Sequence, residues 1–147
     1  MRDSSGVGRL AAQIYLDNAG GGCMTKSVGV ELSAARHGIA ADALRRLRRS
    51  VPIASGIEFV HANALEADLR EATHLYLSSL CFSESVLIAV CTRLLTEAPQ
   101  LLAVAALSDL EPLSAAGWAR TSLEVQMSWG SAWVRLYKRR HQTPPQG

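Results

Sequence analysis

Apolar and polar residues follow two different periods along the chain, which predicts that helices and strands alternate. Apolar residues recur at helical spacing in three segments: residues 8–18, the segment that begins at Ser33 and the segment that begins at Ser83. Short runs of apolar or β-branched residues predict strands at residues 27–32, 57–60, 73–80 and 101–107. Between them we expect a single polar helical turn at residues 66–71 and a loop at residues 109–112.

The helical spacing also predicts which side chains face the core. The inward stripe of the first helix is predicted to be Leu10, Ala11, Ile14 and Tyr15. The inward stripe of the second is predicted to be Ile39, Ala40, Ala43, Leu44 and Leu47. The opposite face of the second helix carries a row of arginines: Arg45, Arg46, Arg48 and Arg49.

The pattern changes near the carboxyl end of the chain. Residues 121–129 alternate between apolar and polar, and residues 132–138 form another strand-like run after Gly130-Ser131. Two strands joined by a two-residue turn predict an antiparallel hairpin. The whole order predicts an α/β fold with a mostly parallel sheet, helices on both faces and a closing hairpin.

Composition narrows the class of protein. With 147 residues, 48% of them hydrophobic, the chain can bury the core of one domain. No apolar run reaches the roughly 18 residues of a membrane span, and no secretory leader is visible. Three unevenly spaced cysteines give no disulfide or zinc pattern. A net charge of +2 is small for a nucleic-acid binder, so we expect an intracellular protein with weak or no direct nucleic-acid binding.

Candidate chemistry centres on Glu31, at the carboxyl end of the strand predicted at residues 27–32. Ligands of α/β sheets bind outside the carboxyl ends of the strands, where a carboxylate can accept hydrogen bonds from both hydroxyls of a ribose. The usual companion is a glycine-rich turn roughly 20 residues earlier. Ser5, Gly6 and Gly8 supply that turn. The pattern therefore predicts a nucleotide-type ligand.

These motifs resemble those of class I S-adenosylmethionine-dependent methyltransferases, and most of all the disruptor-of-telomeric-silencing type, histone-lysine methyltransferases that lack a SET domain. Ser5-Gly6-Val7-Gly8 is similar to the end of the family's glycine loop, and Gly29-Val30-Glu31 to its ribose-binding strand end. Residues 61–65 lie where the family has Gly-Asp-x-Leu beside adenine. Residues 78–82 lie where the histone enzymes have Asn-Asn-Phe, and Ser128-Trp129-Gly130 resembles the family's closing hairpin.

The resemblance implies a cofactor, an acceptor and a set of site residues. S-adenosylmethionine would be bound by Ser5, Gly6, Gly8, Glu31 and Asn63. The transferred methyl group would lie near Ser78, Ser79 and Phe82. The acceptor would be a protein such as a histone.

The chain departs from the family in three places. The family's first strand, central in its sheet, is missing before the glycine loop; the loop's first glycine is Ser4, and its adenine-side aspartate is Asn63. We therefore expect a partial methyltransferase domain over residues 1–140 and a disordered tail over residues 141–147. We expect the strands at 27–32 and 57–60 to form one group, and all later strands another, with the gap unfilled or closed by direct pairing.

Alternatives remain open at this point. Residues 6–11 also fit the G-x-G-x-x-A pattern of nicotinamide-dinucleotide-binding domains. A non-catalytic remnant of a methyltransferase is a third interpretation. Ser78 and Ser79 are equally explained as structural hydroxyls, and the arginine row as a solvated helix face.

Overall fold

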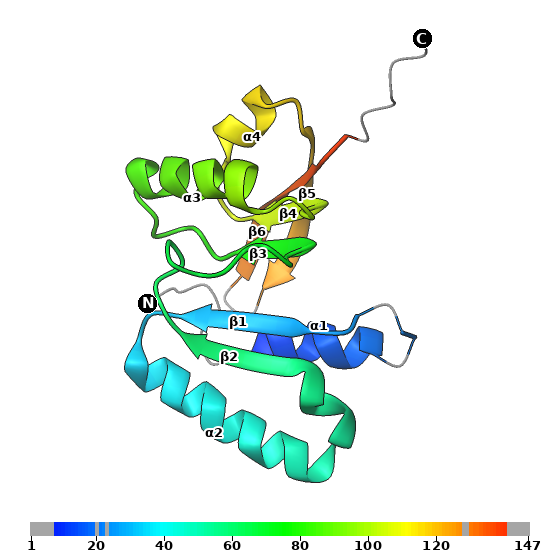
Figure 1. Ribbon diagram of the computed structural model, residues 1–147. Helices are drawn as coiled ribbons and strands as arrows, with labels where there is room; N and C mark the ends of the chain where they lie inside the picture. Colours follow the sequence, from blue (N-terminus) through cyan, green and yellow to red (C-terminus); the bar gives the residue numbers. More distant parts are fainter. Residues whose placement is uncertain (1–7, 20, 23, 128–129, 141–147) are drawn as a thin grey trace. The chain divides into compact units, whose positions relative to one another are not determined.

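In the computed structural model the chain forms two compact units, Met1–Ala67 and Asp68–Gly147. Figure 1 shows the helices and strands of each unit. The residues that the structure describes are 8–19, 21–22, 24–127 and 130–140. Three sequence predictions lie wholly or partly outside them: the role of Ser5 and Gly6, the Ser128-Trp129 end of the predicted strand and hairpin motif, and the disordered tail. In the described part of the chain, no helix combines the length and the hydropathy needed to cross a membrane.

The first unit is a two-stranded parallel sheet packed with helices. Its elements are α1 (Arg9–Ala19), β1 (Ser27–Glu31), α2 (Ala34–Ser50), the short 3₁₀ helix η1 (Pro52–Gly56) and β2 (Ile57–His61). β1 and β2 pair in register from Ser27 opposite Ile57 to Glu31 opposite His61, so both strands end at one edge. Ser33 caps α2 by accepting a hydrogen bond from the Arg36 amide, as the sequence predicts.

The core of the first unit corrects the predicted stripes of its helices. Tyr15 and Leu44 meet Ala54 and Ile57 in one buried cluster, with Phe59 and smaller apolar residues around it. Leu10, Ile14 and Ile39, all predicted to face inward, are exposed instead. Tyr15 is the buried residue of α1, and the partly buried Ala12, Leu16 and Ala19 pack against the cluster at helical spacing of their own. The inward face of α1 is therefore rotated from the predicted one, which leaves Leu10 and Ile14 on the outer side.

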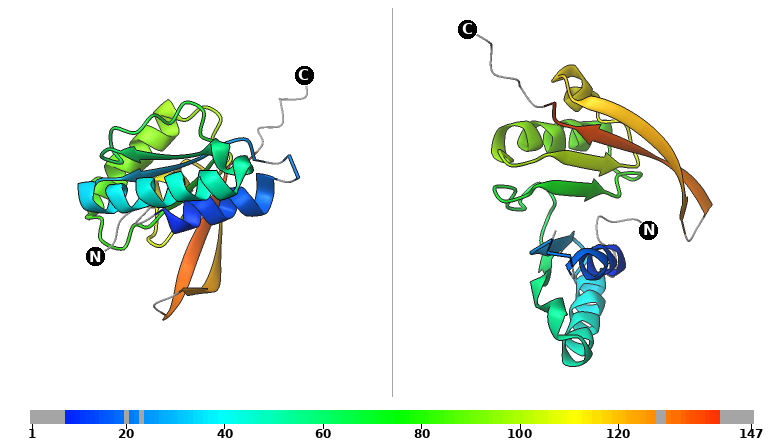
Figure 2. Two further views of the ribbon diagram at one scale, coloured as in Figure 1. Left: turned by 90° about the horizontal axis from the view of Figure 1, so that it is seen from below. Right: turned by 90° about the vertical axis from the view of Figure 1, so that its right-hand side faces the viewer.

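The second unit is a four-stranded mixed sheet with two helices. Its elements are β3 (His74–Leu77), α3 (Glu84–Glu97), β4 (Ala103–Ala106), α4 (Glu111–Ala115), β5 (Ala119–Met127) and β6 (Gly130–Lys138). The strand order is β3-β4-β6-β5, with β3 and β4 parallel and β6 antiparallel to both of its neighbours. Figure 2 shows the long β5–β6 hairpin extending past the rest of its sheet.

The predicted grouping of strands is confirmed. β1 and β2 form one sheet, β3, β4, β5 and β6 form another, and no hydrogen-bonded ladder joins the two among the described strands. An α/β fold with parallel strand pairs and a closing antiparallel hairpin is likewise confirmed. The strand that would contradict the grouping, built from residues 1–8, falls almost wholly outside the described residues.

Three local predictions are wrong for identifiable reasons. Residues 66–71 form turns rather than a helical turn, because the Asp68 carboxylate binds the backbone amide of Arg70 and competes with helical bonding. The predicted loop at 109–112 contains the start of α4, where a proline occupies the first turn. The predicted hairpin turn Gly130-Ser131 belongs to β6, since Gly130 pairs with Met127.

Candidate functional site

The carboxyl edge of the first unit is built around the side chain of Glu31. This carboxylate is only 1% exposed, and its Oε1 accepts two hydrogen bonds, from the Ser33 amide at 2.6 Å and from Arg36 Nη2 at 3.1 Å. Both donors belong to the start of α2, so the strand-to-helix turn itself orients the carboxylate. Glu31 is therefore a preorganised acceptor at the end of β1.

Two histidines connect the loops that follow β1 and β2. The Nε2 atom of His61 lies 2.9 Å from the Leu32 carbonyl oxygen, and the Ala62 amide donates to the Glu31 carbonyl. The His61 ring stacks on His37 of α2 with its centroid 5.5 Å away. Leu32, whose carbonyl contacts His61, is 65% exposed and directly follows Glu31 in the chain. The edge thus joins a buried carboxylate to an exposed apolar side chain.

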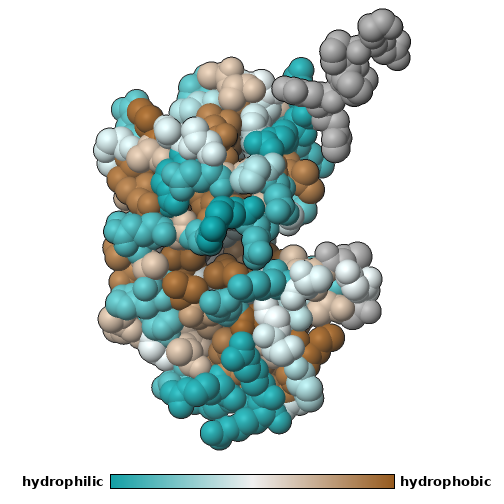
Figure 3. Space-filling model, in the orientation of Figure 1, coloured by the Kyte–Doolittle hydropathy of each residue, from teal (hydrophilic) through white to brown (hydrophobic). Residues whose placement is uncertain are grey.

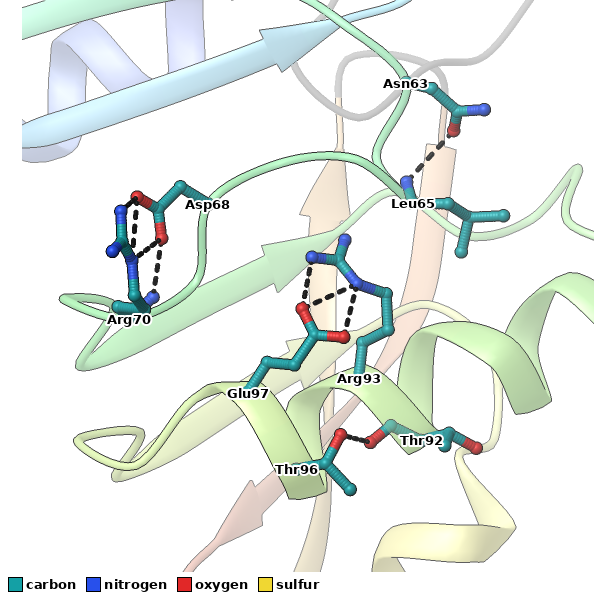
Figure 4. Close-up of polar contacts among 8 residues, drawn as sticks. All are labelled: Asn63, Leu65, Asp68, Arg70, Thr92, Arg93, Thr96 and Glu97. Atoms are coloured by element: carbon teal, nitrogen blue, oxygen red, sulfur yellow. Dashed lines mark hydrogen bonds and ion pairs between the residues drawn. The ribbon is translucent and has the colours of Figure 1, made fainter.

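Asn63 lies in the loop after β2 and forms a local turn (Figure 4). Its Oδ1 accepts a hydrogen bond from the Leu65 amide at 3.0 Å, and its carbonyl accepts one from the Glu66 amide. A backbone amide can donate only to the oxygen of this side chain, which assigns the atom facing Leu65 as Oδ1. The other terminal atom, Nδ2, is a hydrogen-bond donor. An aspartate at this position would instead offer an acceptor. At this position the loop therefore offers a hydrogen-bond donor in place of the acceptor that an aspartate would give.

Gly8 is the one member of the predicted glycine turn among the described residues. It has a φ of +81°, which L side chains rarely adopt, and a Cβ added there would lie 2.3 Å from the Phe59 ring. Its carbonyl accepts the first helical hydrogen bond of α1, from the Ala12 amide. The glycine is thus required for the chain to enter α1 against Phe59.

The second unit contains the predicted methyl-transfer residues. Ser79 is fully buried, and its Oγ accepts a hydrogen bond from the Ser108 amide at 3.0 Å while the Ser108 hydroxyl donates to the Ser79 carbonyl. This pair connects the segments that follow β3 and β4, so the Ser79 hydroxyl has a structural partner. Ser78 is half-buried and bonds the phenol of Tyr76, whose pKa is raised by burial and lowered in smaller part by this bond. Phe82 is half-buried as well.

An ion-pair cluster lies beyond the end of β4. The Asp109 carboxylate pairs with Arg120 of β5 at 2.6 Å and with Arg135 of β6 at 3.4 Å. Arg135 also donates to the carbonyls of Leu107 and Trp133. The cluster fixes the hairpin against the segment that follows β4.

The structure places the predicted site residues in two sets. Gly8, Glu31 and Asn63 belong to the first unit, and Ser78, Ser79 and Phe82 to the second. Sequence reasoning missed the partners of Glu31 and the exposed ring of Trp133. Arg36 lies one helical turn after the Ser33 cap, and this spacing indicates that it can reach the Glu31 carboxylate. The alternation along β6 is the corresponding signal for Trp133, once the register is known.

Comparison with known proteins finds similarity in structure only. No protein-family model matches the chain, and no curated protein matches its sequence. An RNA methyltransferase from Salinibacter ruber, solved with S-adenosyl-L-homocysteine, is 22% identical with a TM-score of 0.62, over 97% of this chain and 80% of that one. The methyltransferase domain of bacterial CtHen1 is 14% identical with a TM-score of 0.71, over 92% and 87% of the two chains.

A third solved structure extends the likeness. The Streptococcus pneumoniae protein Sp1610, a tRNA (m1A22) methyltransferase by description, was solved with S-adenosyl-L-methionine. It is 9% identical with a TM-score of 0.62, and the match covers 90% of this chain and 63% of that one. At these identities the likeness concerns the fold alone. The chain has the Rossmann-like α/β fold of class I methyltransferases, with strands in two sheets and a closing antiparallel hairpin.

Proposed function

We propose that the protein is an S-adenosylmethionine-dependent methyltransferase. The observation that carries the proposal is the position of Glu31, a carboxylate oriented by two donors at the carboxyl end of a parallel strand. α/β folds bind ligands at this edge. The similar structures solved with S-adenosyl-L-methionine or S-adenosyl-L-homocysteine support the choice of cofactor.

The side chains at this edge fit the nucleoside half of the cofactor. The Glu31 carboxylate suits the two ribose hydroxyls, and its burial strengthens such bonds because water does not compete. The exposed side chain of Leu32 suits a face of adenine, and the Nδ2 donor of Asn63 suits an adenine ring nitrogen. Gly6 and Gly8 would lie near the methionine end, as the resemblance implies.

The chemistry needs positioning rather than a covalent enzyme intermediate. Bound S-adenosylmethionine supplies a methyl group on a sulfonium, and the protein must hold an acceptor in line with it in a dry site. Ser78 and Phe82 are our candidates for lining that site. Ser79 is the weaker candidate, because its hydroxyl already holds the Ser108 amide.

Nucleic acid is the acceptor class that we favour. Two of the three similar proteins above are described as RNA or tRNA methyltransferases, which revises our expectation of weak nucleic-acid binding.

A histone-lysine acceptor rests only on the resemblance at residues 78–82. The arginine row that would serve a nucleosome is partly engaged: Arg48 donates to the Ala54 and Ile57 carbonyls and Arg45 pairs with Asp42. Hydrophilic side chains gather over the lower end of α2 in Figure 3, but only part of that charge is available.

Calorimetric titration with S-adenosylmethionine tests the proposal. Glu31→Gln keeps the side-chain shape but replaces charge-assisted bonds with neutral ones, a loss of roughly 1.4 kcal/mol or more, so we expect about tenfold weaker binding. Glu58→Gln is the matched control, because Glu58 is an exposed carboxylate on the neighbouring strand, paired with Lys26. Circular dichroism of each variant checks that the fold is intact.

Four outcomes would contradict all or part of the proposal. Wild-type protein that binds NAD but not S-adenosylmethionine would favour a nicotinamide-binding domain, and binding of neither would favour a remnant. Equal affinity in wild type and Glu31→Gln would remove Glu31 from the site. Transfer of labelled methyl to nucleosomes but not to RNA would restore the histone-lysine interpretation, against our expectation.

A further inference from the structure

The outer part of the β5–β6 hairpin presents an exposed aromatic ring on a polar surface. Paired residues share a face of a β-ladder, so the register defines what we call the Trp133 face: Ser122, Glu124, Gln126, Ser131, Trp133 and Arg135. Trp133 is 54% exposed, and every other member of the face is polar. The apolar hairpin residues Leu123 and Val125 point to the opposite face. Among the described residues of the outer hairpin, the ring therefore has polar neighbours on its own face.

The Trp133 face lies at the carboxyl end of β4. The last residue of β4, Ala106, pairs with Arg135, so Trp133 lies two residues beyond the end of that strand. Figure 2 shows the hairpin continuing past this end. Asp109 pairs with Arg135 and fixes the hairpin there. Ser79, bonded to Ser108, belongs to the same end of the second unit. The ring thus stands at the edge that contains residues 78–82.

We propose that the Trp133 face binds an unpaired base of a single-stranded nucleic acid. This inference rests on the proposed function and identifies the surface that binds the methyl acceptor. A flat indole offers a stacking platform, and the surrounding side chains can donate to or accept from base edges. Protein interfaces centre instead on rings within apolar, desolvated pockets. A duplex hides the faces of its bases, so the platform selects single strands.

The charges on this surface indicate that stacking dominates over phosphate contact. Arg120 and Arg135 share the Asp109 carboxylate, and Glu124 stands directly opposite Trp133 in the ladder. The cluster therefore has little net positive charge. Because affinity from phosphate neutralisation falls steeply with salt, binding by stacking should depend on salt only weakly.

Fluorescence anisotropy with a labelled single-stranded RNA tests the proposal on the full chain. Loss of a stacked base lowers affinity at least about fivefold, which we expect for Trp133→Ala. Trp133→Phe keeps an aromatic face and should restore most of that affinity. Leu123→Ala is the matched control, since Leu123 is also exposed but lies on the other face of the same hairpin. Single-stranded DNA and duplex RNA of the same sequence form two further arms.

Each result decides the proposal. Weaker binding in Trp133→Ala alone, with rescue by Trp133→Phe and weak binding of the duplex, supports it. Equal binding by wild type and Trp133→Ala, an equal loss in Leu123→Ala, or no binding of single strands by wild type would overturn it. Titration of the same samples with S-adenosylmethionine separates the two proposals: cofactor binding without RNA binding refutes this one alone, and RNA binding without cofactor binding refutes only the methyltransferase assignment.

Discussion

Removal of one hydroxyl, in Tyr137→Phe, tests how the second unit holds the segment that follows β4. Tyr137 is fully buried on β6, and its hydroxyl accepts a hydrogen bond of 2.8 Å from the Leu110 amide. Leu110 is fully buried too, and it precedes α4. The phenylalanine variant keeps the ring but leaves the amide without its acceptor.

The magnitude follows from burial. A buried donor that loses its partner costs about 1–3 kcal/mol, because no water replaces the lost acceptor. For a chain of this length, each kcal/mol shifts the melting temperature by about 2–4 °C. We therefore expect the free energy of unfolding to fall by about 1–3 kcal/mol, with Asp109 and its two arginines losing order.

Urea unfolding followed by tryptophan fluorescence is the assay, because the three tryptophans of the sequence all lie in the second unit. Hydrogen exchange at the Leu110 amide gives a local readout, and its protection should drop in Tyr137→Phe. Tyr15→Phe is the matched control, since Tyr15 is buried in the first unit. A loss below about 0.5 kcal/mol with unchanged protection of Leu110 would refute the reasoning.

Two further predictions concern buried groups of the second unit. Ser79→Ala removes the acceptor of the Ser108 amide and should lower the free energy of unfolding by about 1–3 kcal/mol in urea denaturation, while the affinity for S-adenosylmethionine stays the same. Cys91 is fully buried and burial raises its pKa to about 11, so roughly one thiol in a thousand is ionised at pH 8. Peptide mapping after a thiol-reactive label at pH 8 should find Cys91 unlabelled until denaturant is added; rapid labelling would contradict its burial.

The grouping of strands could be predicted from the sequence because it depends on the pattern of apolar residues within each segment. Residues 27–32 and 101–107 are apolar runs of strand length, and Ser33 and Ser83 cap helices in the expected way. The inward faces could not be predicted as well. Both Leu10 and Ile14 fit a helical apolar stripe, but the observed contact of α1 uses the stripe of Ala12, Tyr15, Leu16 and Ala19, and hydropathy alone does not choose between the two.

The candidate site could be proposed from the sequence only where it depends on position along one strand. Glu31 could be chosen as a candidate because a strand end and a glycine turn are local features. The role of Ser79 depends on Ser108, 29 residues away, and nothing local to either residue shows that pairing. The exposure of Trp133 depends in the same way on the hairpin register. A turn predicted at Gly130-Ser131 gives a different register from the observed one, in which Gly130 pairs with Met127.

The use of arginine within the fold bears on the proposed recognition of a nucleic acid. A count of basic residues treats every guanidinium as available, but Arg48 holds the carbonyls after α2 and Arg139 holds the Pro99 carbonyl while covering Trp118. Arg135 likewise binds a carbonyl and a carboxylate. A guanidinium that already bonds carbonyl or carboxylate acceptors loses those bonds when it turns to a phosphate. Recognition by base stacking avoids that cost, which is why an exposed indole is the stronger indicator of a single-stranded partner than the arginine row.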